Sequence, residues 1–170
     1  GIVVRRGRGP ADFQVYYELS ASAASRWGLS GPPFPRPLYQ ALASLPADYV
    51  HLWLADHEGQ TIGALISLHY APGRAMYWGS VMRPGHERWS PTRLLQYQAI
   101  RVACESGATV YNLGPSAGFD GQPLDGVRRA KEVLGARAHD YTLPILRNPW
   151  ALRARVLRDR LAGSRRATRT

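Results

Sequence analysis

One lysine stands in a chain whose other basic residues are all arginine. Lys131 is the only lysine among 22 Lys and Arg residues, and it lies in a helical pattern that begins near Gly126 and ends at Gly135. An arginine is planar and fixed in charge, whereas a lysine ammonium is a compact point charge whose pKa moves with burial. Such an ammonium, held where water is excluded, stabilises negative charge that develops on an oxygen atom. The alternative is an ordinary lysine on a solvated helix face.

Aromatic and glycine-rich positions form a second set of candidates. Tyr77 and Trp78 are adjacent in a strand-like segment. They should therefore face opposite sides, so that one can line a substrate groove while the other packs in the core. Residues 114–121, which include Gly114 and Ser116, follow a strand at its expected carboxyl end, where open α/β sheets bind ligands. The same glycine-rich run is also explained as an ordinary turn.

Two further cations precede a predicted helix. Arg83 and Arg88 lie ahead of Ser90, which we expect to cap a helix that has Pro91 at its first position. The backbone N–H groups at the start of a helix bind phosphate, and the two arginines would add positive charge to such a site. Solvation at the surface explains the same two residues.

The histidines do not suggest a metal centre. The chain has five of them and a single cysteine, and their spacing matches no common set of metal ligands. We therefore expect no metal ion.

The first half of the chain predicts two helices and three strands. The helices are expected at 13–27, with Asp12 as the N-cap, and at 37–45, on either side of the proline-rich connector 31–37. The strands are expected at 49–56, 61–70 and 75–81. Because short turns join these strands, we expect an antiparallel meander.

The second half of the chain alternates between helices and strands. We expect a helix between Ser90 and Gly107, a strand at 109–113, a helix at 124–134, a strand at 139–143 and a last helix at 148–161. Alternation of this kind predicts parallel strands with helices covering the sheet.

Length and charge indicate one domain with basic ends. The chain has 170 residues and a net charge of +10, yet residues 12–146 carry as many acidic as basic residues. We expect residues 1–11 to form a flexible basic segment, residues 12–162 a single domain, and residues 163–170 a disordered basic tail. An Arg-rich tail binds RNA, an anionic membrane surface or nothing in particular. No apolar run is long enough to cross a membrane, and we expect a cytoplasmic location.

Four motifs resemble those of FemAB-like transferases, which are related to the GNAT superfamily of acyltransferases. In chain order they are Tyr77-Trp78-Gly79, Ser90-Pro91-Thr92-Arg93-Leu94-Leu95, Tyr111-Asn112-Leu113-Gly114 and the segment from Gly126 to Gly135 that contains Lys131. The resemblance implies a GNAT-like fold of the α/β class, with a mixed (α+β) sheet. In that fold an antiparallel strand meander passes into β-α-β-α-β, and helices cover both faces.

The resemblance also implies an activity, the transfer of an acyl or aminoacyl group to an amine acceptor, as in peptidoglycan biosynthesis. The implied donor is acyl-CoA or aminoacyl-tRNA, and a tRNA contact and an N-terminal GNAT-like half are further implied partners. Lys131 would be the catalytic residue. Six residues would bind substrate: Tyr77, Trp78, Arg93, Asn112, Gly114 and Ser116.

Two departures from the FemAB-like pattern, and one loop that is absent, keep alternatives open. Asn112 replaces an acidic residue, and an asparagine cannot take a proton as an acidic base would. Ala130 replaces an aromatic residue. Most acetyl-CoA-dependent relatives carry an R/Q-x-x-G-x-G/A loop that cradles a pyrophosphate, whereas residues 82–89 contain a proline and one glycine. The departures favour a donor other than acetyl-CoA, or a non-catalytic half that only binds substrate.

Overall fold

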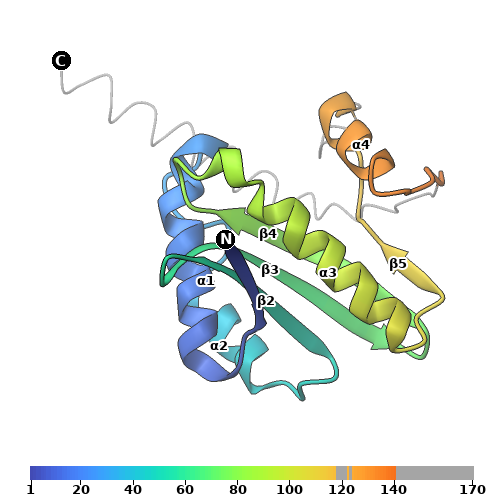
Figure 1. Cartoon of the computed structure of the whole chain (residues 1–170), viewed down its shortest axis with the longest axis horizontal. Helices are drawn as coiled ribbons and strands as arrows, with labels where there is room; N and C mark the ends of the chain where they lie inside the picture. The colour runs from blue at the N-terminus through green and yellow to red at the C-terminus, as the bar shows by residue number, and fades with distance from the viewer. Residues whose placement is uncertain (118–121, 123, 141–170) are drawn as a thin grey trace, which may run out of the picture. The chain divides into compact units, whose positions relative to one another are not determined.

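The computed structural model describes residues 1–117, 122 and 124–140 (Figure 1). Its elements are, in chain order, β1 (Ile2–Arg6), α1 (Gly9–Ala23), the 3-10 helix η1 (Ala24–Trp27), α2 (Arg36–Ser44), β2 (Val50–His57), β3 (Gln60–Ala71), β4 (Arg74–Met82), the 3-10 helix η2 (Glu87–Trp89), α3 (Pro91–Glu105), β5 (Val110–Asn112) and α4 (Asp125–Glu132). All of them belong to one compact unit, Gly1–Ala136. The expected helix 148–161 and tail 163–170 lie outside the described residues. Of the expected strand 139–143, the two described residues are not in a strand.

The five strands form one mixed sheet in the order β1-β2-β3-β4-β5. The three pairs β1–β2, β2–β3 and β3–β4 are antiparallel. Two-residue turns join β2 to β3 and β3 to β4, and turns that short require antiparallel strands. α3 then crosses from β4 to β5, and these two strands are parallel. The predicted meander, the β-α-β unit that follows it and the mixed α/β fold class are thereby confirmed.

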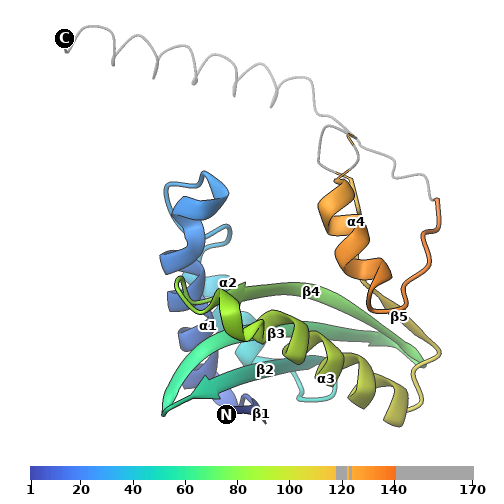
Figure 2. The same ribbon diagram turned by 45° about the horizontal axis from the view of Figure 1, so that its top comes forward.

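Helices cover both faces of the sheet. The first six residues of β2 are all buried, as expected for a strand that is covered on both sides. Leu52 and Leu54 pack with residues of α1 and α2 in one core cluster, whereas Trp53 packs with Leu95 and Ala99 of α3 in the other. Figure 2 shows the same layering, with α3 on one side of the sheet and α1 and α2 on the other.

The first residues of the chain belong to the sheet, so the prediction of a flexible segment over 1–11 is wrong for them. β1 pairs with β2 along its whole length, and α1 begins at Gly9. Ile2 and Val4 pack against the core cluster beneath α3. The prediction fails because it treats the arginines of this segment as solvated charges. In the structure Arg6 donates a hydrogen bond to the carbonyl oxygen of Ala47 at 2.7 Å.

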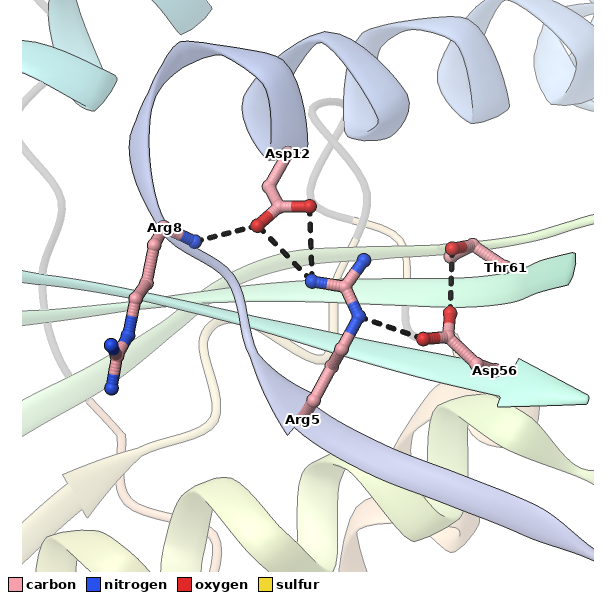
Figure 3. A network of polar contacts seen from close by, with 5 residues as sticks. All are labelled: Arg5, Arg8, Asp12, Asp56 and Thr61. Carbon is pink, nitrogen blue, oxygen red and sulfur yellow. Dashed lines mark hydrogen bonds and ion pairs between the residues drawn. The ribbon is translucent and has the colours of Figure 1, made fainter. Parts of the chain in front are cut away.

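Arg5 ties β1 to α1 and β2 through two carboxylates (Figure 3). Its Nε–H donates to Asp56 at 2.7 Å, and its Nη1–H donates to both oxygens of Asp12 at 3.0 and 3.1 Å. Asp12 also accepts the backbone N–H of Arg8 at 2.7 Å, and Asp56 accepts the hydroxyl of Thr61 at 2.6 Å. α1 begins at Gly9, before Asp12, so the prediction that Asp12 is the N-cap is wrong. Asp12 lies in the first turn of the helix, and its carboxylate accepts hydrogen bonds from the residues that precede the helix.

α3 lies directly on β3 at Gly63. A β-carbon at that position would lie 2.9 Å from Cβ of Pro91, so no larger residue fits without moving the helix. Ser90 precedes the helix as expected, but its backbone is left-handed, with φ of 45°, and its side chain makes no capping hydrogen bond. A capping serine normally bonds from an extended backbone. The capping prediction is therefore wrong, because Ser90 instead turns the chain into the helix.

Two histidine rings stack on the α3 side of the sheet. The ring centroids of His51 on β2 and His69 on β3 lie 3.8 Å apart. Burial, the charge of Arg6 and the neighbouring His69 lower the pKa of His51 to about 3. Burial and Arg6 also lower the pKa of His69. Both rings are consequently neutral near physiological pH, and protonating them opposes folding.

We expect Asp12→Asn to lower the free energy of unfolding by about 1 to 2 kcal/mol, because it weakens charged hydrogen bonds that join β1 to α1. Urea denaturation measures the change. Glu105→Gln is the matched control, since it removes one exposed carboxylate whose nearest contact with Arg101 is 3.7 Å. That control should lose less than about 0.5 kcal/mol. Equal losses in the two variants would contradict a structural part for Asp12.

The histidine pair predicts a loss of stability in acid. In the unfolded chain the pKa of His51 is near 6.5, and in the folded chain it is about 3. The unfolded state therefore binds more protons between these values, and stability is lost as the pH falls from about 6.5 toward 3. His51→Phe keeps a flat ring without the proton site. Its melting temperature should fall less than that of the wild type between about pH 7.5 and pH 5, and parallel curves would refute the assignment.

Candidate functional site

The two edges of β4 are unlike. Along one edge β4 pairs with β3 over nearly its whole length. Along the other it pairs with β5 only at Arg74, Ala75 and Met76. In the part of the chain that the structure describes, no strand pairs with residues 77–82 on this second edge. The carboxyl ends of two parallel strands thus lie beside an open strand edge, where α/β sheets bind ligands and where an extended ligand can add its own hydrogen bonds.

Tyr77 and Trp78 begin the open edge and face opposite sides of the sheet, as predicted. Tyr77 packs against the cluster beneath α3, and its hydroxyl lies 2.9 Å from Oγ of Ser80. Trp78 packs against the cluster beneath α1 and α2. The register of β4 against β3 shifts at this point, which marks a β-bulge at Trp78, and a bulge re-aims the side chain that it carries.

Aromatic side chains from other elements surround Trp78. Phe34, in the proline-rich connector between η1 and α2, stacks on it with ring centroids 5.2 Å apart and is 44% exposed. The hydroxyl of Tyr16 lies so close to Gly79 that a β-carbon there would be 3.0 Å from it. Burial, together with the neighbouring Tyr77, raises the pKa of Tyr16, so this hydroxyl keeps its proton. The side of β4 that faces α1 is therefore an aromatic wall.

Lys131 holds the loop that follows β5. Its ammonium donates hydrogen bonds to the carbonyl oxygens of Gly114 at 3.0 Å and Pro115 at 2.6 Å. Burial lowers the pKa of Lys131. An ammonium has three N–H groups, and among the described residues two of them are bonded to these carbonyl oxygens. The ammonium of the lysine predicted to be catalytic thus lies at the loop that follows the carboxyl end of β5.

Asn112, Gly114 and Ser116 lie in this same loop. The side-chain oxygen of Asn112 accepts the backbone N–H of Gly114 at 2.7 Å, and Gly114 has a left-handed φ of 75°. The carbonyl oxygen of Ser116 accepts the N–H of Leu124 at 2.9 Å. Asn112 therefore shapes a turn, as asparagine commonly does. The structure brings these three residues together with Lys131.

Arg93 lies apart from that group. It is exposed in the first turn of α3, where its backbone N–H donates to the carbonyl oxygen of Ser90 at 3.1 Å. Arg83, in the connection from β4 to α3 (residues 83–90), donates its Nε–H to the carbonyl oxygen of Thr61 at 3.2 Å. The predicted substrate-binding residues therefore fall in three places, on β4, in the first turn of α3 and in the loop after β5.

Two surface hollows of the described chain lie elsewhere. One of about 430 Å³ is lined by residues of the β1–α1 junction and α2, among them Arg6, Phe13 and Leu42. Another of about 210 Å³ lies between α1 and α2. Neither is lined by Trp78 or Lys131. The candidate site is accordingly an open strand edge with a loop at its end rather than an enclosed pocket.

Among the described residues, no group of three or more His, Cys, Asp or Glu side chains is placed to share a metal ion. No described helix has both the length and the apolar surface that crossing a bilayer requires.

Sequence reasoning missed Tyr16 and Phe34. Tyr16 falls within the helix expected at 13–27, and Phe34 within the proline-rich connector 31–37. Helical periodicity does place Tyr16 on the side that meets the sheet, but no local pattern shows that its hydroxyl meets Gly79, which lies far along the chain. The sequence does contain one indication of this cluster. Residues 13–39 carry more aromatic side chains than a pair of solvent-exposed helices would need, which indicates that some of these rings pack together.

Residues 1–121 match the model of a protein family described as acetyltransferase (GNAT) domain. Among solved structures, a possible acetyltransferase from Clostridium difficile 630 is 10% identical, with 86% of this chain and 97% of that chain covered and a TM-score of 0.66. The ribosomal-protein-S18-alanine N-acetyltransferase from Escherichia coli is 14% identical, with 79% and 77% covered and a TM-score of 0.63. An aminoglycoside acetyltransferase from an uncultured soil metagenomic sample is 14% identical, with 87% and 99% covered and a TM-score of 0.63. At these identities the likeness concerns the fold alone. No curated protein matches the chain significantly.

The turn after β5 yields a prediction about Asn112. Asn112→Ala should expose the N–H of Gly114 and speed its hydrogen exchange, while the global free energy of unfolding changes by about 1 kcal/mol or less. Asn112→Asp keeps an accepting oxygen and should preserve the protection. Exchange followed by NMR measures both variants. Unchanged exchange at Gly114 in the alanine variant would show that the side chain does not hold the turn.

Proposed function

The chain belongs to the acetyltransferase (GNAT) domain family, and we propose that it transfers an acyl group from an activated donor to an amine acceptor. The observation that carries the proposal is the open edge of β4 beside the end of β5. An extended donor with amide groups can pair with the free backbone groups of residues 77–82, as an added strand would. Its acyl carbon would then lie near the loop that Lys131 holds.

The proposed reaction makes one bond and breaks another. The amine nitrogen attacks the acyl carbonyl carbon, and a C–N bond forms. The C–S bond of a thioester donor, or the C–O bond of an aminoacyl ester donor, then breaks, and the proton lost by the amine ends on the leaving thiol or hydroxyl. Negative charge gathers on the carbonyl oxygen before that bond breaks. The protein therefore needs a positive group or N–H donors aimed at this oxygen.

Lys131 is the proposed source of that stabilisation. Its ammonium is fixed by the carbonyl oxygens of Gly114 and Pro115, so its position does not depend on the substrate. A donor that is already positioned loses little order in the transition state, which is why fixed charges are effective catalysts. Tyr77, Trp78, Asn112, Gly114 and Ser116 are proposed to bind substrate along the edge and at the loop. Arg93 is proposed to contact the donor at the β4–α3 connection.

The acceptor is proposed to approach from the α1 and α2 side. The rings of Trp78, Phe34 and Tyr39 lie together there, and Tyr39 and Trp78 have ring centroids 6.0 Å apart. An aromatic wall receives the apolar part of an amine and also attracts a cation to its ring faces. This arrangement supports an acceptor that carries apolar surface next to its amino group.

The subtype of the reaction is also a proposal. The FemAB-like motifs favour aminoacyl transfer with aminoacyl-tRNA as donor, whereas the family more generally supports acyl-CoA. A second GNAT-like half and a place in peptidoglycan biosynthesis belong to the FemAB-like proposal. The competing candidate is a half that binds substrate without catalysis. It is favoured by Asn112, which is engaged in shaping its own turn and cannot act as a base.

Replacing Lys131 tests the proposal. Lys131→Ala should lower turnover by about 100-fold or more, with a smaller effect on KM, because the lost interaction is made chiefly in the transition state. Lys131→Arg should recover little, since a planar guanidinium cannot replace a compact ammonium. Product formation is followed by mass spectrometry, with acetyl-CoA or an aminoacyl-tRNA as donor and a panel of primary amines.

Arg129→Ala is the matched control for Lys131, because it removes a cation from an exposed position of the same helix. Its turnover should stay within about twofold of the wild type, as usual for surface changes away from the site. Turnover that survives in the Lys131→Ala variant would remove the lysine from the mechanism. No transfer by the wild type with any donor would favour the half that only binds.

A further inference from the structure

The connection between β4 and α3 has a carboxylate folded back into it. Oε1 of Glu87 accepts the backbone N–H of Gly85 at 3.2 Å and the Nη1–H of Arg26 at 3.0 Å. The same guanidinium donates its Nη2–H to the carbonyl oxygen of Met82 at 2.9 Å, at the end of β4. Arg26 comes from η1, so two segments that are distant in the chain meet at this one carboxylate.

These donors form a small anion-binding arrangement that the chain fills with its own charge. Gly85 has a left-handed φ of 85°, which bends the backbone so that its N–H faces Glu87. Backbone amides of Glu87 itself and of Gly85, followed by the charge of Arg26, lower the pKa of the Glu87 carboxyl. Successive amides in a turn, with a nearby arginine, also bind the oxygens of a phosphate.

The arrangement around Glu87 lies where a strand turns into a helix. It directly follows the carboxyl end of β4 and precedes α3 in the β4-α3-β5 unit. Ligands of open α/β sheets bind at the carboxyl ends of strands, and phosphate groups bind where such a strand turns into a helix. A donor lying along the open edge of β4 would therefore bring any diphosphate it carries to the connection that Glu87 occupies.

We propose that Glu87 is a specificity-determining residue for the donor, whose carboxylate takes the place of a phosphate group and disfavours donors that carry a diphosphate there. The proposal rests on the proposed acyl transfer along β4. A diphosphate must either displace the carboxylate from Gly85 and Arg26 or bind beside its negative charge. Both cost affinity, and a donor without phosphate at this place avoids the cost.

The other basic side chains of the connection, those of Arg83, Arg88 and His86, make contacts with groups other than the Glu87 carboxylate. Arg83 donates to the carbonyl oxygen of Thr61 on β3. Arg88 stacks over the ring of Trp89 at 5.0 Å, and Nδ1 of His86 lies 3.3 Å from the carbonyl oxygen of Pro84. Among the described cations, Arg26 is the one that forms an ion pair with Glu87. Removing the carboxylate should therefore release Arg26 in particular for an incoming phosphate.

Titration calorimetry of the full chain with inorganic pyrophosphate, and separately with coenzyme A, tests the proposal. Glu87→Gln keeps the shape and hydrogen-bonding oxygen of the side chain but removes its charge. It should lower the Kd for both probes by about fivefold or more, because a like charge a few ångströms from the phosphate is gone. The gain should shrink with added salt. Glu105→Gln, which changes the net charge equally at the far end of α3, should show no gain.

The double variant Arg26→Gln with Glu87→Gln decides between a local and a general effect. If the freed guanidinium binds the phosphate, the double variant should lose the gain. Affinity in Glu87→Gln no tighter than in Glu105→Gln overturns the proposal, and so does a gain that persists without Arg26. Glu87→Ala provides the same comparison where the glutamine variant melts below the wild type. Absence of acyl transfer in the turnover assay would refute the proposed reaction, but the binding titrations would still report on Glu87.

Discussion

The structure depends on the unequal pairing of β4. Its hydrogen bonds to β3 fix it in the sheet, and its pairing with β5 stops after three residues. A strand that were paired along both edges would have no backbone groups left for a ligand. A strand that lacked β5 altogether would have no second carboxyl end beside it. The short parallel ladder therefore leaves this sheet an unpaired edge among the described residues, on which the proposed donor can lie.

The close contact of α3 with the sheet explains how that geometry is held. Because Gly63 has no side chain, Pro91 and Leu95 come down onto β3, and the helix buries Ala99 and Ala103 farther along. Small residues on the helix and in the strand allow close approach, which fixes where the crossover ends and β5 begins. On the opposite face the larger aromatic residues of α1 and α2 fill the space. One face thus brings α3 close to the strands, and the other carries the rings that are proposed to receive the acceptor.

The sequence predicted what depends on local periodicity and missed what depends on distant partners. Alternation placed Tyr77 and Trp78 on opposite faces, and short turns predicted the meander. β1 was missed because its arginines look solvated until Asp12 and Asp56 are placed beside Arg5. Motif resemblance selected Lys131, but nothing local shows that its ammonium binds the loop after β5. A left-handed Ser90 is likewise a consequence of how the connection meets α3, and residue type alone favoured a cap.

Under the proposed function, donor choice and bond chemistry belong to two separate parts of the site. The loop held by Lys131 follows β5 and lies near the place where the acyl carbonyl is proposed to react. The connection that contains Glu87 begins after Met82, the end of β4, which is six residues beyond Met76, the last residue of β4 that pairs with β5. A charge at one end of an extended donor acts on its affinity, whereas a charge at the other end acts on the oxygen that gains electrons during the reaction. Under the proposed function, substitutions in the connection would therefore change which donor binds without altering the electrostatics of transfer.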